Sequence, residues 1–113
     1  MGDILRGEVW LLDLNPTLGR GQAGTRPALI ISENIFNKSP ADLVIVVPIT
    51  SQNKNIRSHV RIEEGEGGLT LESFAKCEDV RSVSKIRFIR KFGSVSKETT
   101  GAVEQRLRFL MGL

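Results

Sequence analysis

The sequence predicts a small, mainly β protein in which short strands form a barrel closed by a C-terminal helix. Three observations favour this fold class. Several runs of strand length are rich in Val, Ile and Leu, turn-forming residues separate them, and one long helical pattern ends the chain. At 113 residues the chain is long enough for a single domain over residues 1–113 and too short for two ordinary domains.

The first predicted strand covers Gly7 to Leu14 (GEVWLLDL), because this run is rich in Val, Trp and Leu. The Asn15-Pro16 pair that follows is typical of a turn. Residues 17–25 (TLGRGQAGT) contain three glycines and show no apolar periodicity. This composition predicts a mobile loop after the first strand.

The middle of the chain is predicted to hold three strands. Two apolar runs with β-branched residues, Pro27 to Ser32 (PALIIS) and Leu43 to Thr50 (LVIVVPIT), indicate buried strands. The segment between them, Glu33 to Ser39, has room for one helical turn. His59 to Ile62 (HVRI) alternates in polarity as a half-buried strand does, and a glycine-rich turn follows at residues 65–68.

The last third of the chain is predicted to hold two strands and the one long helix. The strands are Ser73 to Val80 (SFAKCEDV) and Ile89 to Val95 (IRKFGSV), with Ser84 capping a short turn between them. Ser96 is a good N-cap for the helix, and Glu98 lies in its first turn. The apolar stripe of this helix is predicted to consist of Val103, Leu107, Leu110 and Met111.

Positive charge gathers toward the C-terminal end of the chain. The chain has 16 basic and 13 acidic residues and a net charge of +3, and residues 81–113 hold eight of the bases but only two of the acids. Clustered Lys and Arg create a field that attracts phosphates, which is compatible with a polyanionic partner. Charge alone leaves an ordinary solvated surface equally open.

The expected location is the cytoplasm, with no membrane association. Cys77 is the single cysteine and cannot form an internal disulfide, which fits a reducing compartment. The N-terminus lacks the apolar segment of a secretory signal. The longest apolar run, Leu43 to Ile49, is far shorter than the roughly 20 residues that a membrane helix needs.

Several common types of enzyme site do not fit the sequence. One His and one Cys cannot supply a zinc site, so no metal and no other cofactor is predicted. The glycines at 19, 21 and 24 do not lie between a strand and a helix, which argues against a phosphate-binding loop. Cys77 has no convincing His partner, and His59, on an alternating strand, is interpreted as a structural or surface residue.

Polar side chains at the ends of predicted strands remain as the candidate site. They form three groups: Arg20, Gln22 and Arg26; Thr50, Ser51, Gln52 and Lys54; and Lys76, Glu78 and Arg81. Lys76 and Glu78 are two residues apart on a predicted strand and should share one face. Guanidinium and ammonium groups suit a phosphate, and a carboxylate can act as a base. Taken singly, each of these residues also fits an ordinary polar surface.

Three stretches of the sequence form motifs. The first is RGEVWLLDLNPTLGRGQAGTRPALIIS, residues 6–32, which combines a strand, a turn, a glycine-rich loop and an Arg-Pro pair in fixed order. The second is VVPITSQ, residues 46–52, and the third is KCEDVRSV, residues 76–83. These motifs resemble those of the MazF/PemK/Kid family of toxins, and the resemblance extends from about residue 6 to residue 111 and includes the terminal helix.

The resemblance implies the toxin of a type II toxin–antitoxin system, with an SH3-like barrel, short helices and a C-terminal helix. Members of the family are homodimers that cleave single-stranded RNA without metal. The 2′-hydroxyl attacks the adjacent phosphate and leaves 2′,3′-cyclic phosphate and 5′-hydroxyl ends. A cognate antitoxin, whose acidic segment occupies the RNA groove, is the implied partner, and the pair would bind DNA. Phe109, off the apolar stripe of the helix, is expected to be covered in the dimer.

The family's site residues carry over by position. Its key arginine falls on Arg26, its key threonine on Thr50 and the acid of the third motif on Glu78. A fixed guanidinium and a hydroxyl donor would stabilise the charge of the phosphorane, and Glu78 would be the base. The residues expected to bind RNA are Arg20, Gln22, Ser51, Gln52, Lys54, Lys76 and Arg81.

Three positions depart from the family's pattern. The family's Glu in the first loop is Gly21 here, and the His that one branch has in that loop is Arg20. The third motif commonly reads Asp-Gln or Glu-Gln, and here it is Glu78-Asp79. These departures leave the general base and the cleavage specificity open, and they leave Arg26 and Thr50 untouched.

Two alternatives compete with the ribonuclease. One is a non-catalytic relative that only binds RNA or protein, because a fold does not fix a function. The other is a gyrase-directed toxin, since a related barrel family acts on gyrase through its C-terminal helix. The only tryptophan, Trp10, lies in the first predicted strand rather than near the C-terminus, which argues against a gyrase-directed toxin.

Overall fold

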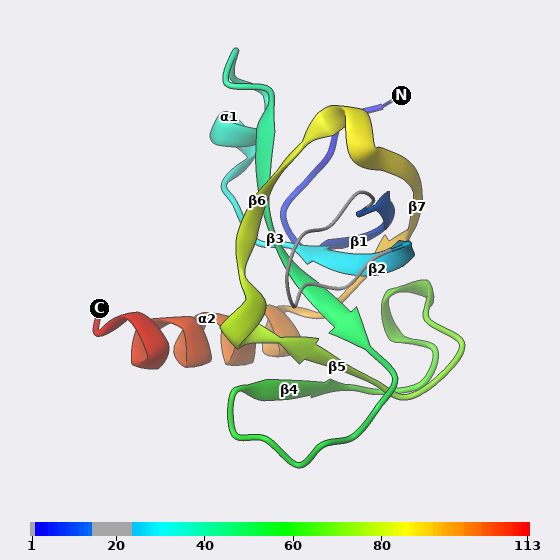
Figure 1. Cartoon of the computed structure of the whole chain (residues 1–113), viewed down its shortest axis with the longest axis vertical. Coiled ribbons are helices and arrows are strands. Elements are labelled where there is room, and N and C mark those ends of the chain that lie inside the picture. Colours follow the sequence, from blue (N-terminus) through cyan, green and yellow to red (C-terminus); the bar gives the residue numbers. More distant parts are fainter. Residues whose placement is uncertain (1, 15–23) are drawn as a thin grey trace.

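The computed structural model describes residues 2–14 and 24–113, whose strands form an antiparallel, barrel-like sheet (Figure 1). Along the sheet the order is β4-β5-β3-β2-β1-β7, and β6 pairs with β3. The strands are β1 (Glu8–Asp13), β2 (Thr25–Ile30), β3 (Leu43–Thr50), β4 (His59–Ile62), β5 (Ser73–Lys76), β6 (Arg81–Ser84) and β7 (Phe88–Ser94).

Two α-helices and three short 3-10 helices accompany the strands in these residues. They are α1 (Asn34–Asn37), α2 (Lys97–Met111), η1 (Glu66–Gly68), η2 (Cys77–Asp79) and η3 (Lys85–Arg87). The predicted mainly β barrel with short helices and a C-terminal helix is therefore confirmed. The predicted turn at Asn15-Pro16 and most of the predicted loop 17–25 lie outside the described residues.

Side chains on both faces of the central strands are buried, in two hydrophobic clusters. Val9 and Leu29 belong to one cluster, which also contains Val103 of α2. Trp10 and Ile30, the next residues along the same strands, belong to the other cluster. Because both faces are covered, β2 and β3 read in the sequence as continuous apolar runs rather than as alternating ones.

The edge of β3 corrects one predicted strand and adds another. The first half of β3 pairs with β6 and its end pairs with β5. The two short strands β5 and β6 therefore lie one after the other along the same edge of β3. Between the two strands η2 breaks the ladder, so the predicted strand at residues 73–80 ends at Lys76. β6 was not predicted, because its four residues, RSVS, carry one buried apolar side chain, Val83.

The terminal helix begins as predicted and ends differently. The Ser96 hydroxyl accepts a hydrogen bond from the Thr99 N–H at 3.2 Å, which confirms the N-cap. Val103 is buried, but Leu110 is 43% and Met111 51% exposed, so the predicted apolar stripe is wrong in the last turn. Figure 1 gives the reason, because the C-terminal end of α2 extends beyond the strands of the barrel.

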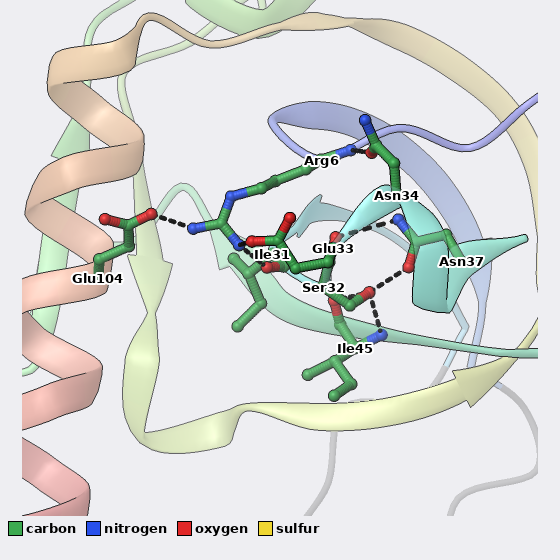
Figure 2. A network of polar contacts seen from close by, with 8 residues as sticks. All are labelled: Arg6, Ile31, Ser32, Glu33, Asn34, Asn37, Ile45 and Glu104. Carbon is green, nitrogen blue, oxygen red and sulfur yellow. Dashed lines mark hydrogen bonds and ion pairs between the residues drawn. The ribbon is translucent and has the colours of Figure 1, made fainter. Parts of the chain in front are cut away.

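A polar network around Arg6 fastens α2 to the barrel (Figure 2). The Arg6 guanidinium donates to the Ile31 carbonyl and to the Glu104 carboxylate of α2, and it lies 3.6 Å from the Glu33 carboxylate. The backbone N–H of Arg6 donates to the Asn34 side-chain oxygen at 2.8 Å. One arginine thereby joins three segments that lie far apart in the sequence.

Asn37 extends this network beneath α1. Its amide nitrogen donates to the Ile4 carbonyl at 3.3 Å and to the Ser32 carbonyl at 3.1 Å. The Ser32 hydroxyl in turn accepts the Ile45 N–H at 2.9 Å (Figure 2). Asn37 is fully buried, and its hydrogen bonds satisfy polar groups that would otherwise be costly to bury.

The predicted glycine-rich turn packs directly on β7. Gly67 and Gly68 have positive φ angles of 66° and 76°, a conformation that side chains disfavour. A Cβ on Gly68 would overlap the Phe92 carbonyl group, and a Cβ on Gly93 would lie 2.8 Å from the Gly67 carbonyl carbon. The turn and the strand can approach this closely only because these positions have no side chain, and the contact holds one wall of the site described next.

Candidate functional site

An open cavity of about 790 Å³ lies where β3 ends. The start of β2, the loop after β3, the segment after η1, the end of β5 and the middle of β7 surround it. Its lining residues are Arg26, Pro27, Ile49, Thr50, Ser51, Gln52, Lys54, Gly68, Leu69, Thr70, Leu71, Ser73, Lys76, Arg90 and Phe92.

The cavity brings together six of the ten predicted site residues. They are Arg26, Thr50, Ser51, Gln52, Lys54 and Lys76. Two others, Glu78 and Arg81, are described but do not line it, so eight of the ten have described positions in all. The remaining two, Arg20 and Gln22, lie outside the described residues.

The β2–β3 register brings Arg26 and Thr50 together. The last pair of this antiparallel ladder is Ala28↔Pro48. If the register is continued by two residues on each strand, Arg26 lies opposite Thr50. Pro27 lacks an N–H group and cannot donate a hydrogen bond to extend this ladder, and Arg26 and Thr50 both line the cavity. Pro27 also favours an extended backbone at Arg26, which holds its Cα at the start of a buried strand.

The turn after β3 fixes the Thr50 hydroxyl. Its oxygen accepts a hydrogen bond from the Gln52 N–H at 3.2 Å, which leaves the hydroxyl proton free to be donated. Ser51, Gln52 and Lys54 follow in an exposed loop. The strand therefore supplies a positioned hydroxyl, and the loop supplies further polar groups beside it.

The lining of the cavity is basic. It contains four cations, Arg26, Lys54, Lys76 and Arg90, and no carboxylate among the described residues. Lys76 lies 3.8 Å from the Asp79 carboxylate, a loose ion pair at the margin of the site. Cations gathered in one hollow raise the local concentration of anions such as phosphates.

Glu78 does not share a face with Lys76, which corrects the sequence prediction. Because β5 ends at Lys76, Glu78 lies in the 3-10 helix η2 and not on a strand. Its carboxylate accepts the Ser58 hydroxyl at 2.6 Å and lies 3.0 Å from the His59 ring nitrogen Nε2. The cavity and this carboxylate are thus separate in the structure.

The surroundings of Glu78 also make it a weaker base. Burial raises the pKa of its carboxyl, but hydrogen bonds from Ser58, from the backbone and from His59 outweigh this effect. The net pKa lies below the ordinary value. A lower pKa stabilises the ionised form and lowers its tendency to take a proton.

Arg81 lies on β6, where it pairs with Val46 of β3. Its Nε and Nη2 atoms are buried and have no hydrogen-bond partner among the residues that the structure describes. Arg81 does not line the cavity, and its predicted contact with RNA stays a prediction.

His59 takes a structural place, one of the two that the sequence left open, and Cys77 is buried in the core. The His59 side chain is buried and bonded to Glu78. Burial raises the pKa of the Cys77 thiol to about 11, so this sulfur stays protonated and unreactive near neutral pH. Across residues 2–14 and 24–113, no three His, Cys, Asp or Glu side chains group together as metal ligands would.

Sequence reasoning missed one wall of the cavity. Thr70 from the segment after η1, Ser73 at the start of β5, and Arg90 and Phe92 from β7 line it beside the predicted residues. No local pattern marks the last two, because their place beside the cavity depends on the irregular pairing of β7 with β1. For Thr70 and Ser73 the sequence offered no signal either, because neither residue belongs to one of the three motifs.

Fold and site together define a small barrel protein with a basic, hydroxyl-bearing cavity at the end of its central strand. The sequence model of the PemK-like, MazF-like toxins of type II toxin–antitoxin systems matches residues 5–111. The chain therefore belongs to this toxin family, and the resemblance of its three motifs is confirmed. Among the described residues, no helix is long and apolar enough to cross a membrane.

Similar proteins agree with this assignment. The chain is 30% identical over 111 residues to endoribonuclease EndoA of Bacillus subtilis (strain 168), covering 97% of this chain and 96% of the relative. The crystal structure of MazF from Deinococcus radiodurans matches with a TM-score of 0.89 at 23% identity, and the match covers both chains completely. A mycobacterial endoribonuclease in complex with its cognate antitoxin matches with a TM-score of 0.78 at 23% identity, over 100% of this chain and 97% of that one.

Proposed function

We propose that this chain is an endoribonuclease that cleaves single-stranded RNA, and that residues 1–113 act as one toxin domain. The observation that carries the proposal is the cavity in which Arg26 and Thr50 meet among further cations and no described carboxylate. Such a site suits a chain of phosphates with exposed hydroxyl groups. The similarity to EndoA of Bacillus subtilis, itself named an endoribonuclease, supports the same conclusion.

In the proposed reaction the 2′-hydroxyl oxygen of one nucleotide attacks the adjacent phosphorus. The bond to the 5′-oxygen of the next nucleotide breaks, and the products carry a 2′,3′-cyclic phosphate and a 5′-hydroxyl. Arg26 stabilises the negative charge that gathers on the phosphorane, and the Thr50 hydroxyl donates a hydrogen bond to it. Ser51, Gln52, Lys54 and Lys76 bind the flanking RNA.

Glu78 remains the candidate base by its place in the family motif, although it lies outside the cavity. Replacing it with glutamine distinguishes a role as general base from a purely structural role. If Glu78 removes the proton in the reaction, Glu78→Gln lowers turnover roughly as strongly as the loss of a general base does, by about 10² or more. If it only holds Ser58 and His59 in place, turnover per folded molecule stays near that of the wild type.

We also propose that the chain works as a homodimer. The end of α2 leaves Phe109, 82% exposed, together with Leu110, Met111 and Leu113 on the surface of the single chain. Apolar side chains gathered at one end of a helix favour burial against a second copy. A dimeric mass by light scattering at micromolar concentration is expected, and a purely monomeric mass would contradict the proposal.

A cognate antitoxin and a cytoplasmic location complete the proposal. The basic cavity suits an acidic antitoxin segment that competes with RNA, and the toxin–antitoxin pair would bind DNA. The mycobacterial structure of an endoribonuclease with its cognate antitoxin gives a precedent in a protein of the same fold.

The test is incubation of the purified chain with mixed RNA in EDTA, followed by analysis of the ends. Cleavage with 2′,3′-cyclic phosphate and 5′-hydroxyl ends is expected without any divalent ion. Cleavage that requires an added divalent ion would overturn the mechanism. RNA binding without cleavage would instead favour the non-catalytic alternative. Against the gyrase-directed alternative stands the place of the single tryptophan, Trp10, which is buried in β1 and not near the C-terminus.

A further inference from the structure

Arg90 and Phe92 form a stacked pair on the β7 wall of the cavity. The Arg90 guanidinium carbon lies 4.6 Å from the centre of the Phe92 ring. Both residues line the cavity, with the arginine exposed and the ring half-buried. A guanidinium over an aromatic face is attracted by the ring, so Phe92 supports the Arg90 guanidinium and limits its motion; we call the Phe92 ring the seat of Arg90.

Irregular pairing of β7 with β1 directs this pair toward the cavity. Trp10 pairs with Lys91 and Val9 with Gly93, which leaves Phe92 as an extra residue in a β-bulge. Bulges change the direction in which side chains point and are frequent beside active sites. Lys91 does not join the lining and instead forms an ion pair at 2.8 Å with Glu8.

The seat is also rigid. η1 packs against the backbone of β7 at Phe92, and a side chain on Gly68 would overlap the Phe92 carbonyl. A side chain on Gly93 would lie 2.8 Å from the Gly67 carbonyl carbon. Because this close approach holds the strand, the ring beneath Arg90 is positioned before any ligand binds.

The position of Arg90 places it beside the proposed reaction centre and not in it. Leu11 of β1 pairs with Arg90 on one side and with Pro27 on the other, so the three residues form one row across β7, β1 and β2. Two strand spacings, about 10 Å, separate the backbone of Arg90 from that of Pro27. Arg26 is next to Pro27 in the sequence, so the position of Arg90 suits contact with a nucleotide adjacent to the cleaved bond.

We propose that Arg90, seated on Phe92, stacks on the base of a nucleotide next to the cleaved bond. This inference rests on the proposed ribonuclease function and assigns a further binding residue to that site. A planar guanidinium covers a base from its flat face, and proteins use this contact for single-stranded RNA. No described carboxylate forms an ion pair with Arg90, so its charge and its outer face are free for the ligand. An acidic peptide would need only a point charge and gains nothing from the aromatic seat.

The test measures cleavage of a short RNA that contains one cut site. Arg90→Ala is expected to raise KM by roughly ten-fold, the scale of losing one stacked base, and to change kcat by less than about two-fold. Arg90→Lys should restore only a small part of the loss, because an ammonium has no flat face. Phe92→Leu, which keeps an apolar side chain, should raise KM in the same direction. Lys38→Ala, which removes one positive charge from the segment after α1, is the control and should cut as the wild type does.

Oligonucleotides that lack one base beside the cut identify the contact. At one flanking position, removal of the base should lower the affinity of the wild type as much as the Arg90→Ala substitution lowers the affinity for intact RNA. Removal of the same base should not lower the affinity of Arg90→Ala any further. If the loss of affinity from base removal and the loss from Arg90→Ala add fully, the proposal is wrong and Arg90 contacts a phosphate instead. A wild-type KM for Arg90→Ala, or full rescue by Arg90→Lys, would overturn it as well.

Binding to an uncleavable 2′-deoxy oligonucleotide separates this inference from the proposed function. If the wild type binds this probe but cuts no RNA, the ribonuclease proposal fails, and the binding of Arg90→Ala still decides the role of Arg90. If Arg90→Ala binds the probe normally but an acidic peptide poorly, the residue serves a protein partner and the proposal is wrong. Thermal melting of each variant shows that it is folded.

Discussion

Two arginines of this chain lie in opposite surroundings. The Arg6 guanidinium is enclosed by the Ile31 carbonyl and the carboxylates of Glu33 and Glu104 (Figure 2). Arg26 is exposed at an open cavity and forms no ion pair with a described residue. The same side chain therefore joins secondary-structure elements in one region and remains free for a ligand in the other.

The difference shows how the fold divides stability from function. Around Arg6, hydrogen-bond donors and acceptors pair with one another within the chain, so these contacts stabilise the folded state. At the cavity, cations gather without described carboxylates, which costs some repulsion and leaves their charge for an anion. The predictions below test this division, beginning with the largest expected loss of stability.

The largest of them concerns Arg6. Arg6→Ala leaves the Ile31 carbonyl and Glu104 without their partner, and we expect the free energy of unfolding to fall by about 2 kcal/mol. Cleavage per folded molecule should stay unchanged, because Arg6 does not line the cavity. Urea denaturation and cleavage assays on the same preparation measure both quantities. Lys38→Ala, which removes only a surface ion pair at 3.9 Å, is the matched control and should cost less than about 1 kcal/mol.

Thr50 gives a smaller effect of the opposite kind. Thr50→Val keeps the shape of the side chain and removes the hydroxyl, so turnover should fall at least about ten-fold while the melting temperature changes little. Single-turnover cleavage at saturating protein measures this loss. Unchanged turnover would show that the hydroxyl serves only the turn with Gln52.

Acid pH should weaken the stabilising contacts first. Burial raises the pKa of Glu66, but hydrogen bonds from Thr99 and from Ser96 outweigh it and leave the pKa below 4.5. A carboxyl whose pKa is depressed in the folded state stabilises the fold above its unfolded pKa, and this stability is lost as the pH falls through the folded value. Stability should therefore drop below about pH 4.5, and less steeply in Glu66→Gln. Equal slopes in urea titrations from pH 6 to pH 3 would contradict this.

The sequence predicted the regular parts of the fold better than the site. β2 and β3 were evident as apolar runs, and Ser96 marked the start of α2. The break at η2 was not evident, because Glu78 fits a strand pattern as well as a turn. Its true position depends on Ser58 and His59, which are distant in the sequence.

Arg26 and Thr50 were predicted by their motifs, and the β2–β3 register explains why the two residues meet. Arg90 and Phe92 were missed, because their place in the site depends on a β-bulge that no local pattern marks. The exposed end of α2 was missed for a related reason. A helical period predicts which side chains share a face but not where the barrel beneath them ends.

The central claim is that the cavity cleaves RNA and that Arg26 stabilises the transition state there. It is tested most directly by measuring the cleavage rate and the melting temperature of Arg26→Ala in one preparation. We expect turnover to fall by about 10² or more with the melting temperature nearly unchanged, and only partial rescue by Arg26→Lys. Near-normal cleavage by a well-folded Arg26→Ala protein would contradict the account.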